Sequence, residues 1–248
     1  MALHIGTSGW SYKEWKGFFY PPVIKTTDWL SYYATVFDCT EINMSFYHLP
    51  KQQTVDKWAN AVPAGFKFCP KMSRYVTHIK RLKDVEDSLD KFFNVFDPIS
   101  DLLGPVLIQL PPSLKYDHDI VAAFIQSLLK KYPMHRYALE ARHASWINDD
   151  AFQLLRDHNI AWVISQSGVG FPYAEVVTAN HIYLRFHGPE KLFDSSYSQE
   201  MLQYYANKIS GWLREGFEVW AFFNNTMNGH AIQNVRDIQE MISIALSI

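Results

Sequence analysis

The sequence predicts an α/β fold, a single-domain, TIM-like (β/α)8 barrel, and three observations lead to this prediction. Eight short apolar runs of strand type recur along the 248 residues. Amphipathic stretches with helical periodicity separate most of them. The first run lies at the start of the chain, and a C-terminal helix follows the last. Eight alternating strand and helix units are typical of a closed barrel, and a doubly wound open sheet is the alternative.

The predicted strands are recognised as apolar runs bounded by turn or polar residues. They begin near Leu3, Asp38, Phe66, Pro105, Tyr137, Ala161, His181 and Phe217. Apolar residues spaced three or four apart predict helices over 28–37, 51–61, 85–96, 120–129, 198–215 and 231–246. The segment 168–180 contains Gly168, Gly170 and Pro172 and leaves little room for a helix, so we expect the sixth helix to be short or missing.

Composition is that of an ordinary globular protein, and we expect one domain over residues 1–248. The net charge of −2 argues against a non-specific nucleic-acid binder, which needs a basic surface. No apolar run reaches the roughly 18 residues of a membrane span, and the start lacks the pattern of a signal peptide, so we expect a cytoplasmic protein without membrane contact. Cys39 and Cys69 have no zinc-site spacing and are expected to be buried free thiols.

Strand alternation assigns one face of each predicted strand to the helices and the other to the barrel interior. Most strands turn polar on the inward face toward their carboxyl ends, where the active sites of such barrels lie. The predicted inward polar set is Ser8, Glu41, Asn43, Lys71, Gln109, Glu140, Arg142, Arg185, His187 and Asn224, with Gln166 as a further candidate. A structural ionic network is the alternative. A ligand pocket is favoured. Barrel interiors are normally filled by branched apolar side chains, so a purely structural interior would have little reason to hold these charged residues.

Glu41 and Glu140 are the candidates for general acid and base, with His187 assisting. Their separation would distinguish retaining from inverting glycoside chemistry if they acted on a sugar. Each glutamate has the alternative role of pairing with a neighbouring cation. His187 alternatively serves as a hydrogen-bonding residue.

Lys71, Arg142 and Arg185 resemble a clamp for a phosphate or carboxylate. Three cations against two glutamates leave one positive charge, which favours an anionic ligand. Charge balance for the glutamates is the alternative. A Schiff base on Lys71 is a minor hypothesis, since the sequence does not distinguish it from an ion pair.

Aromatic residues follow three of the predicted strands and suit stacking on a sugar or a base. This predicted wall consists of Trp10, Tyr12, Trp15, Tyr47 and Trp146. Loop packing is the alternative for each. His143 is expected to contact ligand beside Arg142. The sequence has no HxH, HExxH or DxD spacing, so we predict no metal and no cofactor.

Six motifs along the chain resemble the domain of unknown function 72 family, also called the YecE-like family. They are GTSGWSYKEWKGFFYP (6–21), TEINMSFYHLP (40–50), LIQLPPS (107–113), LEARHASW (139–146), YLRFHG (183–188) and FFNNTMNGHAIQN (222–234). The resemblance covers essentially the whole chain. It implies a TIM-barrel-like single domain and a bacterial or archaeal cytoplasmic protein, and it implies no particular reaction.

The residues that match the family motifs include residues of the predicted inward polar set. They are Gly6, Ser8, Trp10, Glu41, Asn43, Phe46, Tyr47, Lys71, Gln109, Pro111, Glu140, Arg142, His143, Trp146, Arg185, His187, Gly188, Asn224, Asn225, Gly229, Ala231 and Asn234. Family members often have an Asp where the sixth strand ends, whereas this chain reads Ser165-Gln166-Ser167. They also often have Asp or His where this chain has Thr226. Both departures remove groups that bind metals or move protons.

The leading hypothesis is a metal-independent enzyme of hydrolase or isomerase type that binds a small anionic or sugar-like ligand at the barrel mouth. A non-catalytic binding protein for a nucleotide or a nucleic-acid end is one alternative, and nucleic acid is not the favoured partner. A metal-dependent phosphoesterase or nuclease is the other. The sequence does not indicate an oligomeric state.

Overall fold

The computed structural model describes residues 2–168 and 170–247, and it confirms the predicted barrel. Eight parallel strands are ordered β3-β2-β1-β8-β7-β6-β5-β4 around its axis. Their bounds are β1 Leu3–Thr7, β2 Cys39–Ile42, β3 Lys67–Pro70, β4 Val106–Gln109, β5 Tyr137–Glu140, β6 Ala161–Gln166, β7 His181–Phe186 and β8 Glu218–Phe223. Every strand begins within one residue of its predicted start.

The barrel closes between β3 and β4 through isolated backbone bridges. Phe68 pairs with Leu103 and Lys71 pairs with Leu107, both in parallel orientation. The backbone N–H of Lys71 also donates to the carbonyl of Ile42 on the other side, at 3.1 Å. Lys71 therefore lies just beyond β3, where the sheet becomes a closed ring.

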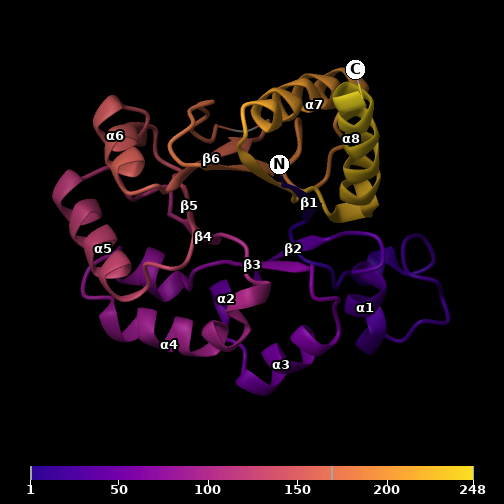
Figure 1. Ribbon diagram of the computed structural model, residues 1–248, viewed down its shortest axis with the longest axis horizontal. Helices are drawn as coiled ribbons and strands as arrows, with labels where there is room; N and C mark the ends of the chain where they lie inside the picture. The colour runs from indigo at the N-terminus through magenta and orange to yellow at the C-terminus, as the bar shows by residue number, and fades with distance from the viewer. Residues whose placement is uncertain (1, 169, 248) are drawn as a thin grey trace.

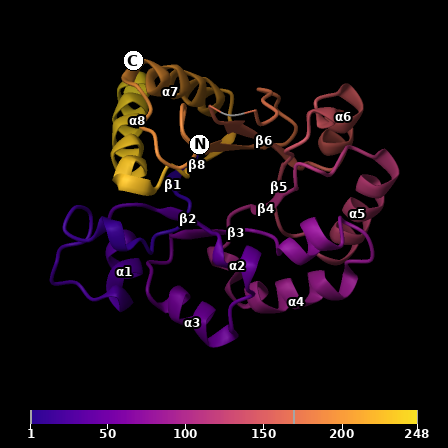
Figure 2. The same cartoon turned by 180° about the vertical axis from the view of Figure 1, so that it is seen from behind.

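Helices surround the strands in a ring, as Figures 1 and 2 show. Their bounds are α1 Trp29–Tyr33, α2 Met44–Tyr47, α3 Gln52–Asn60, α4 Glu86–Phe96, α5 His118–Lys131, α6 Asp149–Asp157, α7 Gln199–Arg214 and α8 His230–Ser247. Short 3-10 turns cover Lys13–Trp15, Thr26–Asp28, Asp97–Leu102, Ala144–Trp146 and Met227–Gly229, and one π-helical turn covers Tyr75–Ile79.

The described residues between β6 and β7 form no helix, so the helix that would follow the sixth strand is missing, as predicted. Residue 169 of this loop, like residues 1 and 248 of the predicted domain, lies outside the described part of the chain. The prediction over 28–37 was too long, because α1 ends at Tyr33. Helix α6 was not predicted, although Asn148 caps it by accepting a hydrogen bond from the backbone N–H of Ala151.

Two apolar layers fill the molecule. The larger layer joins the helices to the outward faces of the strands. The smaller one plugs the lumen and consists of Cys39, Cys69, Leu107, Ala138, Ala161, Val163, Ala179, Tyr183, Trp220 and Phe222. Both cysteines are buried and free, as predicted. The plug excludes water from the lower lumen, so the polar inward residues gather above it at the carboxyl ends of the strands.

Gly6 on β1 lies where the backbone of β2 approaches too closely for a side chain. A Cβ at this position would lie 2.1 Å from the carbonyl oxygen of Cys39. We expect Gly6→Ala to lower the free energy of unfolding by about 3 kcal/mol, because the obstructing atom is backbone and cannot rotate away. Gly211→Ala in α7 is the matched control. Its Cβ meets nothing within 4 Å, and it should stabilise the helix by up to about 1 kcal/mol in urea denaturation.

His4 lies at the amino end of the barrel, opposite the polar inward set. Its Nδ1 lies 3.0 Å from Asp38 Oδ2, its Nε2 lies 3.5 Å from Glu218 Oε1, and its ring stacks on Trp220 with centroids 3.9 Å apart. Burial by itself would lower the pKa of His4, but the hydrogen bonds and negative charges of Asp38 and Glu218 outweigh it and raise the pKa above 6.5. The folded protein therefore holds a proton on His4 that the unfolded chain releases near neutral pH.

This ionisation predicts a pH-dependent effect of His4→Gln. The stability that His4 contributes is fully present below pH 6.5 and is lost as the pH rises through its folded pKa. The substitution should therefore cost about 1 kcal/mol more at pH 6 than at pH 9. Urea denaturation at both pH values measures the difference, with the exposed His48→Gln as control. An equal loss at both pH values would contradict the assignment.

None of the helices in the described residues has the length and apolar character needed to cross a bilayer.

Candidate functional site

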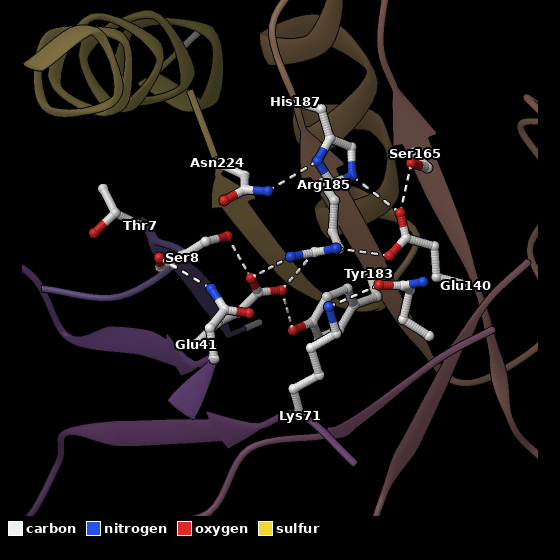
Figure 3. Close-up of polar contacts among 12 residues, drawn as sticks. Thr7, Ser8, Glu41, Lys71, Glu140, Ser165, Tyr183, Arg185, His187 and Asn224 are labelled. Carbon is white, nitrogen blue, oxygen red and sulfur yellow. Dashed lines mark hydrogen bonds and ion pairs between the residues drawn. The ribbon is translucent and has the colours of Figure 1, made fainter. Parts of the chain in front are cut away.

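The polar residues at the barrel mouth come from the carboxyl ends of separate strands, as strand alternation predicts. Glu41 lies on β2, Glu140 on β5 and Arg185 on β7, with His187 just beyond β7. All four are buried. The structure brings them together into one hydrogen-bonded network above the apolar plug (Figure 3).

Arg185 is the centre of this network. Its Nε and Nη2 donate to the two carboxylate oxygens of Glu41, each at 2.8 Å, and its Nη1 donates to Glu140 Oε2 at 2.6 Å. Figure 3 shows the guanidinium between the two glutamates. The two carboxylates therefore face the same cation, which occupies the space where a scissile bond would have to lie between an acid and a base.

Glu41 has no free acceptor direction. Besides Arg185, its carboxylate accepts hydrogen bonds from Ser8 Oγ and, at 2.8 Å, from the hydroxyl of Tyr183. The same hydroxyl is buried, and its burial together with the charge of Glu41 raises the pKa of Tyr183 well above 10. Tyr183 thus remains a neutral donor that holds Glu41 in place.

Glu140 is similarly surrounded by donors. Its Oε1 accepts from Ser165 Oγ at 2.7 Å and lies 2.7 Å from Arg142 Nη2 and 3.0 Å from His187 Nε2. Burial by itself would raise the pKa of Glu140, but the charges of Arg142 and Arg185 and the contact with His187 hold it well below its usual value. Glu140 is therefore an ionised acceptor at neutral pH.

His187 is neutral. Burial lowers its pKa to about 4, and the nearby charge of Glu140 only partly offsets this effect. Asn224 Nδ2 lies 3.0 Å from His187 Nδ1. An amide N–H donating to Nδ1 leaves the proton on Nε2, which then donates to Glu140. Both ring nitrogens are thus occupied within the network.

Lys71 is the cation that the glutamates leave unpaired. In the described part of the chain no carboxylate lies within ion-pairing distance of its Nζ, which donates to Gln109 Oε1 at 2.7 Å and lies 4.2 Å from the ring centroid of Phe46. Burial, with the charge of Arg185 adding to it, lowers the pKa of Lys71 to about 7. A substantial fraction of this amine is therefore uncharged at neutral pH. Lys71 as a whole is 8% exposed.

Arg142 follows β5 and lies beside this network at the mouth. Its guanidinium carbon lies 3.5 Å from the ring centroid of Phe171, which comes from the loop that replaces the sixth helix. The Nε of Arg142 is buried and has no hydrogen-bond partner among the described residues. An orphaned guanidinium donor at the mouth is suited to an anionic ligand, because burying such a donor without an acceptor is costly.

A hollow of about 180 Å³ opens beside Glu41, lined by the end of β2, by residues that follow β1 and β2, and by Trp58 of α3. Ser8, Trp10, Tyr12 and Asn43 from the predicted site all line it. Tyr12 and Asn43 are oriented by hydrogen bonds to the carbonyl of Ser8, at 2.6 and 3.1 Å. The hollow thus combines an aromatic wall with oriented polar groups.

Of the remaining predicted aromatic residues, two are buried and one is exposed. Trp146 does not line the mouth, which corrects the predicted ligand contact. It is fully buried, and its indole N–H donates to the carbonyl of Leu114 at 3.0 Å. Trp15 is likewise buried and donates to the carbonyl of Thr226. Tyr47 is 64% exposed, and its ring packs edge-to-face on that of Phe46 with centroids 5.0 Å apart.

His143 has a local role. Its Nδ1 accepts from the backbone N–H of Ser145 at 3.1 Å and so caps the short turn that contains Trp146. The ring remains half-buried. No hydrogen bond or ion pair joins the side chain of His143 to Arg142 or to the network among the described residues.

Reasoning from strand alternation missed four residues of the site, namely Tyr183, Ser165, Phe46 and Phe171, although the family motifs had included Phe46. On β6 the inward residue is Ser165, while Gln166 points outward and accepts from the hydroxyl of Tyr197. The candidate Gln166 was therefore wrong by one position. Strand alternation already placed Tyr183 on the inward face, and its polar hydroxyl group could have identified it as a site residue.

No group of three or more His, Cys, Asp and Glu side chains within residues 2–168 and 170–247 is arranged to hold a metal ion.

Comparison with known proteins identifies the family. The family model described as "Protein of unknown function DUF72" matches residues 4–247. The chain belongs to the DUF72 family. This DUF72 protein is 24% identical over 275 aligned residues to the UPF0759 protein YunF of Bacillus subtilis, covering 99% of this chain and 96% of YunF. It is 23% identical to the UPF0759 protein YecE of Escherichia coli K12, covering 85% and 82% of the two chains.

Solved structures agree with the DUF72 assignment. A DUF72 family protein from Thermotoga maritima is 30% identical, with a TM-score of 0.88, covering 98% of this chain and all of that one. A DUF72 family protein from Enterococcus faecalis shares the fold at 19% identity and a TM-score of 0.84. The family is of unknown function, so the reaction has to be argued from the site itself.

Proposed function

We propose that this protein is a metal-independent acid–base enzyme, of hydrolase or isomerase type, that acts on a small anionic or sugar-like ligand at the barrel mouth. The observation that carries the proposal is Lys71, a buried amine with an amide partner and no carboxylate partner among the described residues. A group whose pKa lies near 7 both takes up and releases protons efficiently at neutral pH. Such a group at the catalytic end of a TIM barrel is typical of a proton carrier.

Arg142 is the proposed anion-binding residue, because its Nε has no partner among the described residues and its plane is fixed against Phe171. The hollow beside Glu41 would hold the rest of the ligand against Trp10 and Tyr12. A ligand with hydroxyl groups suits this hollow, since its lining combines aromatic faces with oriented polar atoms.

Glu41, Glu140 and His187 are proposed as positioning residues, which revises the hypothesis that they carry protons. All three are buried, and each is occupied by donors or acceptors of the network. They hold the two guanidinium groups of Arg185 and Arg142 in place. The third cation of the charge count is Lys71, and its pKa of about 7 leaves it only partly charged at neutral pH.

Exchange of ligand hydrogens with solvent tests the proposal without knowledge of the product. The protein would be incubated in deuterated, metal-chelated buffer with pyruvate, glucose 6-phosphate and ribose 5-phosphate, and proton NMR would follow loss of C–H signals. We expect at least one probe to exchange, and Lys71→Met to slow that exchange at least about 100-fold. Lys67→Met, at the other end of the same strand, is the matched control.

Binding measurements separate the anion site from the proton carrier. Arg142→Gln should weaken binding of the exchanging probe about tenfold, the equivalent of about 1.4 kcal/mol, and should do so in the Lys71→Met protein as well. No exchange of any probe, together with salt-sensitive binding of short single-stranded DNA or RNA, would instead favour the non-catalytic alternative.

A further inference from the structure

Lys71 is placed as a nucleophile as well as a proton carrier. A buried ammonium without a carboxylate partner costs several kcal/mol, so burial favours the uncharged amine, and the ring of Phe46 offsets only part of this cost. An uncharged amine has a lone pair directed away from its acceptor. Lysines desolvated in this way react with carbonyl groups to give Schiff bases.

The backbone of Lys71 is fixed more firmly than a surface lysine requires. Its N–H donates to Ile42, its carbonyl accepts from Ser45 Oγ at 2.7 Å, and it forms the bridge to Leu107 that closes the barrel. Its side chain is then oriented by Gln109 from β4. A nucleophile has to be held in this way if it is to meet the reacting carbon in one geometry.

The groups around Nζ suit a positively charged imine. The face of Phe46 lies 4.2 Å from Nζ and stabilises a cation without quenching it, as a carboxylate would. Gln109 Oε1 accepts the remaining N–H. Arg142 follows β5, the strand next to β4, and its unpartnered Nε offers a hydrogen bond to an anionic group on the same ligand.

We propose that Lys71 forms an iminium with the carbonyl carbon of a small aldehyde or ketone whose carboxylate or phosphate group lies on Arg142. This inference rests on the proposed function, because it uses the same amine and the same anion-binding residue, and it adds the class of substrate. It also makes Lys71 a catalytic residue that is bonded to the substrate during the reaction.

The step needs no reagent beyond the substrate and one proton from solvent. The lone pair of Nζ adds to the carbonyl carbon, and a proton moves from nitrogen to the former carbonyl oxygen to give a carbinolamine. A proton from solvent binds to its hydroxyl group, one water molecule leaves as the C–O bond breaks, and the nitrogen lone pair forms the C=N bond. The resulting iminium draws electrons from the adjacent carbon, so C–H bonds there become acidic and exchange with solvent.

Borohydride reduction tests for the iminium, because it converts a C=N bond into a stable secondary amine. The full chain would be incubated at pH 7 with glyoxylate, pyruvate or dihydroxyacetone phosphate, reduced, and analysed by intact mass and peptide mapping. We expect a single adduct on Lys71 with at least one probe. Lys71→Arg should abolish this adduct, and Lys67→Arg should leave it unchanged.

A comparison of charged and uncharged probes tests the requirement for an anionic group. Uncharged dihydroxyacetone should be trapped at least tenfold less than the reactive anionic probe. Arg142→Gln should reduce trapping of the anionic probe at least tenfold and remove most of the difference in trapping between this probe and dihydroxyacetone. Carboxylate and phosphate probes that differ in yield identify which anion the site takes.

Three outcomes overturn the inference. No adduct on Lys71 with any probe, while solvent exchange in the NMR experiment depends on Lys71, would leave the proposed function in place and remove the covalent step. Equal labelling of wild type and Lys71→Arg would show that surface lysines react. Neither trapping nor exchange with any probe would remove both proposals. Peptide mapping of the wild-type protein decides the first outcome even if Lys71→Arg fails to fold.

Discussion

Replacing Arg185 with methionine is expected to lower the free energy of unfolding by about 3 to 5 kcal/mol, the cost of removing one partner from a buried ion pair. Arg185 bridges Glu41 and Glu140, and all three side chains are buried. Without the guanidinium, Glu41 has no cationic partner within ion-pairing distance among the described residues, whereas Glu140 keeps Arg142. Urea denaturation at neutral pH measures the loss, with the exposed Arg156→Met as control.

The loss should also depend on the charge of Glu41. In the Arg185→Met protein, the carboxylate of Glu41 stays buried without its cation, which is costly. Adding Glu41→Gln removes this unpaired charge and should recover part of the loss. A small loss that Glu41→Gln does not change would contradict the bridging role.

Strand parity made most of the site predictable from the sequence. Because side chains alternate rigidly along a strand, the positions of Glu41, Glu140 and Arg185 within their apolar runs suffice to assign all three to one interior. Counting charges also anticipated that one cation would lack a carboxylate. The charge count could not identify this cation. In the structure the guanidinium of Arg185 pairs with both glutamates, and Lys71 is the cation without a carboxylate partner among the described residues.

The errors have physical causes. The run AWVISQ on β6 is apolar on both faces, as in many buried parallel strands, so alternation did not separate Ser165 from Gln166. Trp146 was misplaced because an aromatic residue on a loop carries no periodicity, and its direction depends on how the loop packs against Leu114. Phe171 lies in a segment without repeating pattern, and no sequence signal indicates that its ring covers Arg142.

Replacing Lys71 with methionine is expected to abolish function and to stabilise the fold. Methionine keeps much of the apolar stem but removes the buried amine, so proton transfer should fall about 10²- to 10⁴-fold. The same change removes the cost of holding an ammonium group away from water. Because the folded pKa of Lys71 is lowered from 10.5 to about 7, the unfolded chain binds the extra proton between these values. Wild-type stability from this group is therefore lowest below pH 7 and recovers as the pH rises toward 10.5.

The gain in stability of Lys71→Met over wild type should follow this profile. It should amount to a few kcal/mol at pH 6, given about 1.4 kcal/mol for each unit of pKa shift, and should shrink toward zero near pH 10. Lys67→Met is the control, because Lys67 begins the same strand but is only half-buried and donates to the carbonyl of Asp101. A stabilised, inactive Lys71→Met protein would show that the chain keeps an unfavourable buried amine for its chemistry. A destabilised one would show that the amine is part of the structural network, and the proton carrier would then have to be sought elsewhere at the mouth.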